Sequence, residues 1–128
     1  MRMQEIHTDA APASIGPFSQ GVKDGGRIFV SGQGPVDPDT GEIIGDDIEE
    51  QTAQTLENVA AVLEAGGSSL DAVVKSTVFV TDMANYDAVN DVYDEFVSDP
   101  YPARSAVEVA DLPIDIGVEI EVVATTDP

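Results

Sequence analysis

Arg104 is the residue of this sequence whose type and setting most clearly suggest binding chemistry. The chain carries 25 acidic side chains against five basic ones, and Arg104 is its only arginine inside an apolar alternating segment, Tyr101-Pro-Ala-Arg-Ser-Ala-Val-Glu-Val. A guanidinium is always charged, and its fork of N–H donors matches a carboxylate or a phosphate. Two interpretations are open: Arg104 clamps an anionic substrate, or it forms a structural ion pair with a nearby glutamate.

Glu119 is the carboxylate that we expect beside Arg104. Alternation divides two expected strands, about 103–109 and 117–125, into two faces. One face carries Arg104, Ala106 and Glu108 together with Glu119 and Glu121. If the two strands pair as a hairpin, Arg104 and Glu119 are direct or diagonal neighbours. The simpler alternative is a solvated sheet face with a cross-strand ion pair.

Short strands and turns are expected before the first helix. The strands are residues 3–8 and 27–31, with an irregular stretch at 10–20 between them. Residues 37–42 predict a hairpin-type turn, because Pro38 presets one turn position and Gly41 can take a positive φ.

Two amphipathic helices are expected after this turn. The first begins after the capping residue Asp47 and ends at Gly66-Gly67, and its apolar stripe is Ile48, Thr52, Leu56, Val59 and Leu63. A β-branched strand follows at 72–81. Asp82 caps the second helix, which ends at Asp99-Pro100. Its shared face is Tyr86, Val89, Tyr93 and Phe96.

The order β, β, β, α, β, α, β, β predicts one α+β domain, residues 1–128, with two helices on one face of a mixed β-sheet. A small sheet covered on one side commonly covers its other side by oligomerising, so a polar face would line a cavity between copies. Gly32, Gly34 and Gly41 lie in turns between strands, which argues against a phosphate cradle.

Composition excludes several classes of protein and site. A chain of 128 residues with 42% hydrophobic side chains can bury a core without disulfides or metal. With no cysteine and one histidine, His7, we expect no disulfide, no cysteine nucleophile and no metal site. No basic leader and no run of 18 apolar residues are found, so we expect a cytoplasmic protein with no membrane partner.

The acidic balance also limits the partners. A net charge of -20 repels phosphate backbones, so no nucleic-acid partner is expected. Disorder is the alternative for so acidic a chain, but the apolar periodicities oppose it. The composition instead predicts a folded, halophilic protein adapted to concentrated salt, where the screening length falls to about 3 Å.

Six motifs, in order, carry a resemblance that runs nearly end to end. They are Ala13-Ser-Ile-Gly-Pro-Phe-Ser-Gln-Gly, Val30-Ser-Gly-Gln, Val74-Lys-Ser-Thr-Val-Phe-Val, Val89-Asn, Tyr101-Pro-Ala-Arg-Ser-Ala-Val-Glu-Val and Val118-Glu-Ile-Glu. Each motif alone is weak evidence, but together they coincide with the expected strands, turns and helices. On these motifs the chain resembles the RidA/YjgF family of enamine and imine deaminases.

The resemblance implies a chorismate-mutase-like fold and a homotrimer with three clefts between subunits. It implies that 2-aminoacrylate or its 2-iminoacid tautomer is hydrolysed to a 2-ketoacid and ammonia without a cofactor, a metabolite damage control reaction. By position, Arg104 would clamp the substrate carboxylate and Glu119 would deprotonate the attacking water. Ser31 and Asn90 would complete the polar lining.

Two positions depart from the family pattern. Phe18 stands where a tyrosine is common, which leaves an aromatic wall without its hydroxyl, and Ala106 replaces a frequent cysteine but keeps its backbone N–H. Simpler interpretations are also open: packing for Phe18, a hydroxyl bonded to its own backbone for Ser31, and solvent exposure for Asn90.

A non-catalytic, chaperone-like protein that binds small carboxylates in the same cleft is the alternative function. Glu119 argues against it, because a second negative charge beside an anionic ligand weakens binding unless it serves the chemistry. The net charge argues against ribonuclease activity, which is sometimes proposed for relatives of this family.

Overall fold

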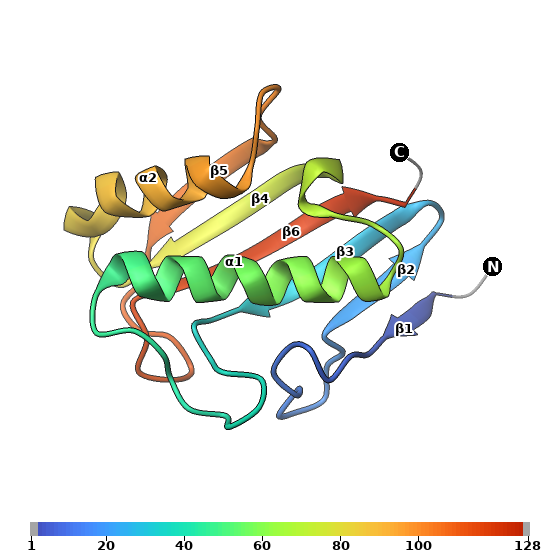
Figure 1. Ribbon diagram of the computed structural model, residues 1–128, viewed down its shortest axis with the longest axis horizontal. Helices are drawn as coiled ribbons and strands as arrows, with labels where there is room; N and C mark the ends of the chain where they lie inside the picture. The colour runs from blue at the N-terminus through green and yellow to red at the C-terminus, as the bar shows by residue number, and fades with distance from the viewer. Residues whose placement is uncertain (1–2, 127–128) are drawn as a thin grey trace.

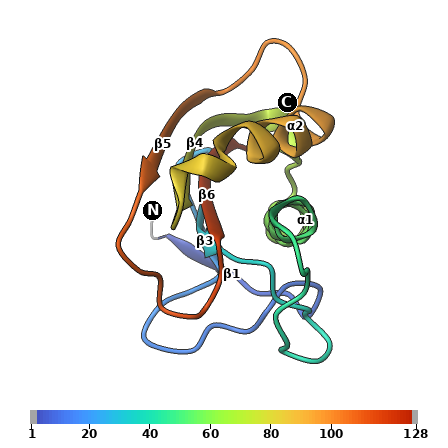
Figure 2. The same ribbon diagram turned by 90° about the vertical axis from the view of Figure 1, so that its left-hand side faces the viewer.

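A six-stranded mixed β-sheet carries both α-helices on one of its faces (Figures 1 and 2). The computed structural model describes residues 3–126. The strands are β1 (Gln4–Ile6), β2 (Gly21–Asp24), β3 (Arg27–Gln33), β4 (Val73–Val80), β5 (Ala103–Glu108) and β6 (Val118–Thr125). The helices are α1 (Ile48–Ala65) and α2 (Tyr86–Phe96), with 3₁₀ turns at Leu70–Ala72 and Met83–Asn85. The predicted α+β class and two-helix arrangement are confirmed.

The predicted cap of the first helix is present, whereas the predicted cap of the second helix lies one 3₁₀ turn too early, since α2 follows Asn85, which makes no side-chain cap hydrogen bond. Asp47 Oδ1 accepts from the Glu50 backbone N–H at 2.8 Å, and Gly66 caps the other end of α1. Asp82 Oδ1 accepts from the Ala84 backbone N–H at 2.9 Å, so it caps the 3₁₀ turn that leads directly into α2. Within residues 3–126, neither helix has the length and apolar character needed to cross a membrane.

Strand β2 was not predicted. Its sequence, Gly-Val-Lys-Asp, has no β-branched run, and it is defined by the tight turn that joins it to β3. Gly25 and Gly26 occupy that turn with φ of 59° and 84°, values that favour glycine. The predicted turn at 37–42 is present, where Asp37 Oδ1 accepts from the Asp39 backbone N–H at 2.7 Å, but beyond it only one bridge forms, between Val36 and Ile43.

The predicted hairpin of the last two strands is wrong. The strand order is β1-β2-β3-β6-β4-β5, so β4 separates β5 from β6. β5 pairs in parallel with β4, whereas β6 pairs antiparallel with both β3 and β4. The reason is α2, which carries the chain from the end of β4 back to its start and thus sets β5 parallel to it (Figure 1).

The strand order also corrects the expected faces. Arg104 lies opposite Ser76 of β4, and Ser76 lies opposite Val122, which is buried under the helices. Glu119 lies opposite Phe79, whose partner in β5 is Val107. Register partners share a face, so Arg104 and Glu119 lie on opposite faces of the sheet, and the prediction that they share a face is wrong.

The core fills the space between the helices and the sheet. α1 contributes Leu56, Val59 and Leu63, which pack with Ile28 of β3 and Ile120 of β6. The other face of the sheet has no helix over it in the described chain (Figure 2). That open face combines apolar and acidic groups: Phe29 and Val107 are 45% and 41% exposed beside Glu119 and Glu121.

Candidate functional site

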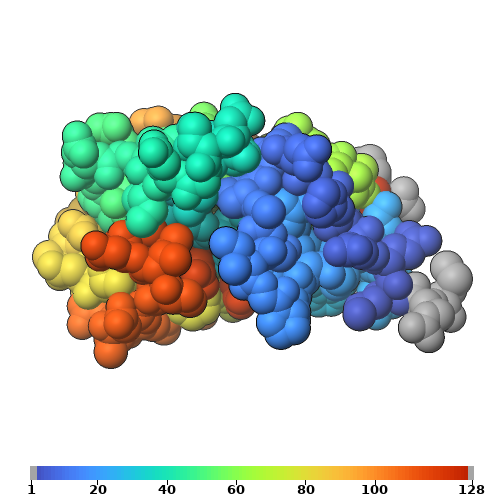
Figure 3. All heavy atoms as spheres, turned by 90° about the horizontal axis from the view of Figure 1, so that it is seen from below, coloured from blue at the N-terminus to red at the C-terminus, as the bar shows by residue number. Residues whose placement is uncertain are grey.

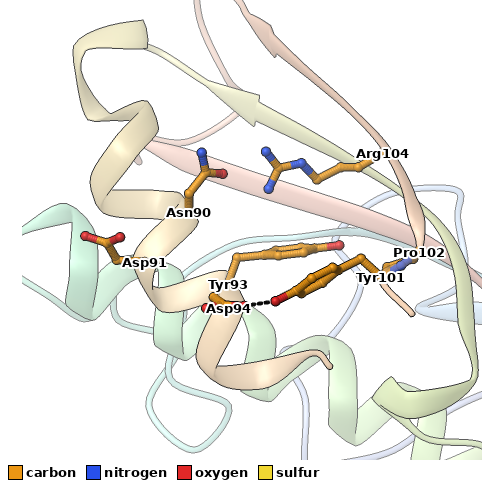
Figure 4. A pocket seen from close by; sticks show the side chains of 7 residues that line it. All are labelled: Asn90, Asp91, Tyr93, Asp94, Tyr101, Pro102 and Arg104. Atoms are coloured by element: carbon orange, nitrogen blue, oxygen red, sulfur yellow. Dashed lines mark hydrogen bonds between the residues drawn. The ribbon is translucent and has the colours of Figure 1, made fainter. Parts of the chain in front are cut away.

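A cleft of about 410 Å³ lies where α2 passes over the edge strand β5 (Figure 4). Its lining residues are Asn90, Asp91, Tyr93, Asp94, Tyr101, Pro102 and Arg104. α2 supplies the first four because positions 90, 91, 93 and 94 follow helical spacing. β5 and the segment before it supply the other three, so the Tyr101-Pro-Ala-Arg motif forms one wall.

Two tyrosines of α2 hold Arg104. The guanidinium carbon lies 4.9 Å from the ring centroid of Tyr93 and 5.6 Å from that of Tyr86, and Nη2 donates to the Tyr86 hydroxyl at 3.2 Å. Tyr93 is fixed in turn by a 2.7 Å hydrogen bond between its hydroxyl and Ser76 Oγ. Within residues 3–126, the partners of Arg104 are tyrosines rather than a carboxylate, so its fork is available to an anion.

Asn90 faces the same cleft, one helical turn after Tyr86. It is half-buried and lines the cleft with Arg104, so the alternative of simple solvent exposure is wrong. Hydrogen bonds with Asn90 and with Arg104, together with the positive charge of Arg104, lower the pKa of Tyr86. Asn90 Oδ1 is buried and has no hydrogen-bond partner among the described residues.

Tyr101 forms the outer wall of the cleft. Its hydroxyl donates a hydrogen bond to Asp94 Oδ1, which connects the phenol to α2 (Figure 4). That hydrogen bond, with the negative charge of Asp94, raises the pKa of Tyr101. The carboxylate of Asp94 is thereby directed to Tyr101.

Glu119 belongs to a second group on the open face. Its carboxylate lies directly against Gly32, where an added Cβ would overlap it. Gly32 and Ser31 lie where the register between β3 and β6 shifts, and such bulges commonly redirect side chains. Burial of the carboxylate, and secondarily the charge of Glu121, raise the pKa of Glu119.

The loop before β2 joins this second group. Ser31 Oγ donates to the Ser19 carbonyl at 2.6 Å, so its hydroxyl binds the neighbouring loop rather than its own backbone. Phe18 precedes Ser19 and is 53% exposed, which rules out simple core packing within one subunit. Figure 3 shows this loop beside residues 35–46 and 109–116 on the side of the molecule that faces down in Figure 1.

Gln20 is a buried organising residue of this loop that sequence reasoning missed. Its Nε2 donates to the Ala11 and Pro12 carbonyls at 3.2 and 2.8 Å, and Oε1 accepts from the Thr8 backbone N–H at 2.8 Å. One side-chain amide thus provides hydrogen-bond partners for backbone groups of an irregular stretch that does not pair with a β-strand. The sequence feature that could have indicated this role is the side-chain amide in the Phe-Ser-Gln motif.

The predicted site residues therefore form two half-sites. The arginine half-site contains Arg104, Asn90 and Ala106. Ala106 lies two residues after Arg104 in β5, on the same face of the sheet, and packs against the core. The glutamate half-site contains Glu119, Ser31 and, by chain connection, Phe18. Within residues 3–126, no three His, Cys, Asp or Glu side chains are arranged to hold a metal.

Tyrosines 86, 93 and 101 are site residues that sequence reasoning did not assign. Tyr86 and Tyr93 were placed in the apolar stripe of the second helix, and the sequence does not say which stripe residues contact Arg104. Their shared seven-residue spacing on one helix face was the available signal.

Comparison with known proteins gives consistent matches over the whole domain. The family model described as endoribonuclease L-PSP matches residues 8–126. A Salmonella typhimurium protein named 2-iminobutanoate/2-iminopropanoate deaminase is 48% identical over 93% of this chain and 94% of its own length. The crystal structure of RidA from an Antarctic Psychrobacter has a TM-score of 0.92 at 44% identity, over 95% of this chain and 98% of that one. The crystal structure of Escherichia coli TdcF with bound serine has a TM-score of 0.90, also at 44% identity, over 95% of this chain and 98% of that one.

Proposed function

This chain belongs to the endoribonuclease L-PSP family, and we propose that it is a hydrolase acting on C=N bonds, which converts reactive 2-iminoacids and 2-aminoacrylate to 2-ketoacids and ammonia. The observation that carries the proposal is the guanidinium of Arg104, held by Tyr86 and Tyr93 at a cleft without a carboxylate partner among the described residues. The name of the Salmonella relative supports it. A cytoplasmic setting is part of the proposal, because iminoacids arise where amino acids are metabolised.

The proposed site lies between two copies of the chain. Arg104 and Glu119 lie on opposite faces of the sheet, so one subunit cannot direct both at one small substrate. A neighbour whose own arginine half-site packed on the open face would cover Phe29 and Val107 and bring its Arg104 to Glu119. We propose a homotrimer with three such sites, and light scattering tests it, because a monomer at every salt concentration would remove the shared cleft.

In the proposed mechanism, Arg104 binds the substrate carboxylate through its fork, which places the imine carbon within reach of one water. Glu119 takes a proton from that water as its oxygen bonds to the carbon, and returns it to the imine nitrogen to give a carbinolamine. Glu119 then takes the hydroxyl proton of the carbinolamine and delivers it to the nitrogen as the C–N bond breaks, so ammonia leaves and the 2-ketoacid remains. The raised pKa of Glu119 suits this step, since a stronger base accepts the proton more readily.

Two other activities are weighed against this proposal. A carboxylate-binding protein without turnover is the alternative, and the relative with bound serine supports ligand binding in this fold. The family description supports RNA cleavage, but a net charge of -20 opposes binding of a phosphate backbone.

A coupled assay tests the proposed function. An amino-acid oxidase generates the iminoacid, and release of the ketoacid is followed with and without the protein, in low and in high salt. We expect faster release with the protein. Binding of ketoacids without acceleration for any iminoacid would instead favour the binding protein.

Glu121→Gln should shift the pH dependence of this activity. The charge of Glu121 contributes to the raised pKa of Glu119, so removing that charge lowers the pKa of Glu119. A general base works only when it is ionised. The acidic limb of the kcat/KM profile should therefore move to lower pH, with little change at high pH. An unchanged or upward-moving limb would show that another group titrates there.

We also propose that the protein is adapted to salt, and its stability should rise with salt concentration. With 25 acidic and five basic side chains, the native surface repels itself until the charges are screened. Melting temperatures followed by circular dichroism across a potassium chloride series should climb, most steeply below about 1 M, where the screening length approaches 3 Å. A flat or falling series would contradict the halophilic interpretation.

A further inference from the structure

Gly32 lies against the carboxylate of Glu119, on the strand next to it in the sheet. A side-chain methyl group at this position would overlap Glu119 Oε2 and would lie 2.7 Å from Cδ and 3.0 Å from Cγ. Carbon atoms in favourable contact are about 3.5–4.0 Å apart. While Glu119 keeps its position, only a residue without a side chain therefore fits at Gly32.

The backbone at Gly32 does not itself require glycine. Gly32 lies within β3, and it is not among the glycines that have a positive φ, which are Gly16, Gly25, Gly26, Gly41, Gly45 and Gly67. Alanine is therefore compatible with the backbone at this position. The three heavy atoms that an added Cβ would meet first all belong to Glu119. The steric need for glycine thus comes from Glu119.

The two strands that flank Glu119 differ in what they place beside it. On one side Phe79 of β4 is its register partner, so a bulky side chain lies next to the glutamate. On the other side the register between β3 and β6 shifts between Val30 and Gln33, and Gly32 lies within that shift. A glutamate side chain has several rotatable bonds, so a base on an open sheet face needs a contact that holds it. The gap at Gly32 provides that contact.

We propose that Gly32 is a positioning residue: its missing side chain forms a seat in which the carboxylate of Glu119 lies against β3, in the position from which it accepts a proton from water. This proposal rests on the proposed function for the role of Glu119 as the base. Gly32 acts here through the space that it leaves, so its contribution is measured by filling that space.

Gly32→Ala fills the seat. The atoms that it displaces are the end of a flexible side chain, so the variant should fold, with a melting temperature close to that of the wild type. We expect kcat for 2-iminobutanoate to fall at least about tenfold, because a base displaced by about 1 Å is misaligned with the water. The dissociation constant of 2-ketobutyrate, measured by calorimetry, should change little, since Arg104 binds the carboxylate. An unchanged kcat would overturn the proposal.

A double-mutant cycle with Glu119→Asp shows whether the effect of Gly32→Ala passes through Glu119. Aspartate keeps a carboxylate that can act as a base, but it is shorter by one methylene and leaves the space at Gly32 empty. In the Glu119→Asp background, Gly32→Ala should therefore lower kcat by less than about twofold. An equal loss in both backgrounds would overturn the proposal, because the added methyl group would then act on the backbone or on another side chain.

Gly34→Ala is the matched control. Gly34 follows two residues later, also without a positive φ, and its added Cβ would lie 2.7 Å from Ile116 Cδ1, again the end of a flexible side chain. Both variants thus add one methyl group against one movable side chain. Gly34→Ala should retain wild-type activity. A loss as large as that of Gly32→Ala would assign the effect to the segment rather than to Glu119 and would overturn the proposal.

Carbon-13 NMR titration of the Glu119 carboxyl tests the seat without turnover. Burial is the main cause of the raised pKa of Glu119, and the charge of Glu121 remains in the variant. Gly32→Ala should push the carboxyl toward water and lower its pKa, and a pKa that does not fall would overturn the proposal. A lowered pKa in a protein without turnover would keep the seat and remove the proposed function. Turnover that Gly32→Ala leaves intact would keep the function and remove the seat.

Discussion

Arg104→Ala should lower kcat/KM for iminoacid hydrolysis by roughly a thousandfold, because it removes both the charge and the fork that position the substrate. In this cleft the guanidinium donates to the Tyr86 hydroxyl and lies over the rings of Tyr86 and Tyr93. It has no carboxylate partner among the described residues, so the substitution breaks no ion pair there. The loss should appear equally as loss of 2-ketobutyrate binding, measured by calorimetry.

Two variants give this experiment its controls. Arg104→Lys keeps the charge but not the fork, so we expect an intermediate loss. Arg27→Ala removes an arginine of β3 that is exposed and whose side chain donates to the Gly26 carbonyl, so its activity should match the wild type. Full activity of Arg104→Ala would refute the carboxylate clamp, whatever the reaction.

The sequence singled out Arg104 and Glu119 as candidates but did not predict their arrangement. Arg104 was recognisable because a charged side chain inside an apolar strand is costly to desolvate, and binding of an anion is one reason to keep it there. Helix caps such as Asp47 were predictable because a cap is decided within four residues of chain. Strand order is decided by packing, and the return of the chain through α2 placed β4 between the two strands whose alternation had seemed to bring Arg104 and Glu119 together.

The remaining errors have the same physical cause. Tyr93 fits an apolar stripe by spacing, and only the tertiary structure shows that its ring faces Arg104 and its hydroxyl faces Ser76. In the sequence Gln20 resembles an ordinary polar loop residue, and only the structure shows that its buried amide binds the backbone of Thr8, Ala11 and Pro12. β2 owes its existence to pairing rather than to local propensity.

Glu119→Gln should lower kcat by about a hundredfold while leaving the affinity for 2-ketobutyrate nearly unchanged, since the amide keeps the shape but cannot accept the proton. Unfolding should not explain the loss. A carboxyl whose pKa is raised by folding makes the folded state less stable as pH rises through that pKa, so at neutral pH the amide should match or exceed the wild-type melting temperature. Undiminished turnover would remove Glu119 from the mechanism.

Mixing the two inactive variants should restore activity if the site is shared between subunits. In a ring where Arg104 of one subunit meets Glu119 of the next, an intact site needs a Glu119→Gln subunit followed by an Arg104→Ala subunit. Random assembly of equal amounts, unfolded together and refolded, gives this order at about a quarter of the sites, so about a quarter of wild-type activity should return. Each variant refolded alone is the control. Mixed assemblies, verified by copurification of a tagged variant, that remain inactive would show that Arg104 and Glu119 do not act on the same substrate molecule.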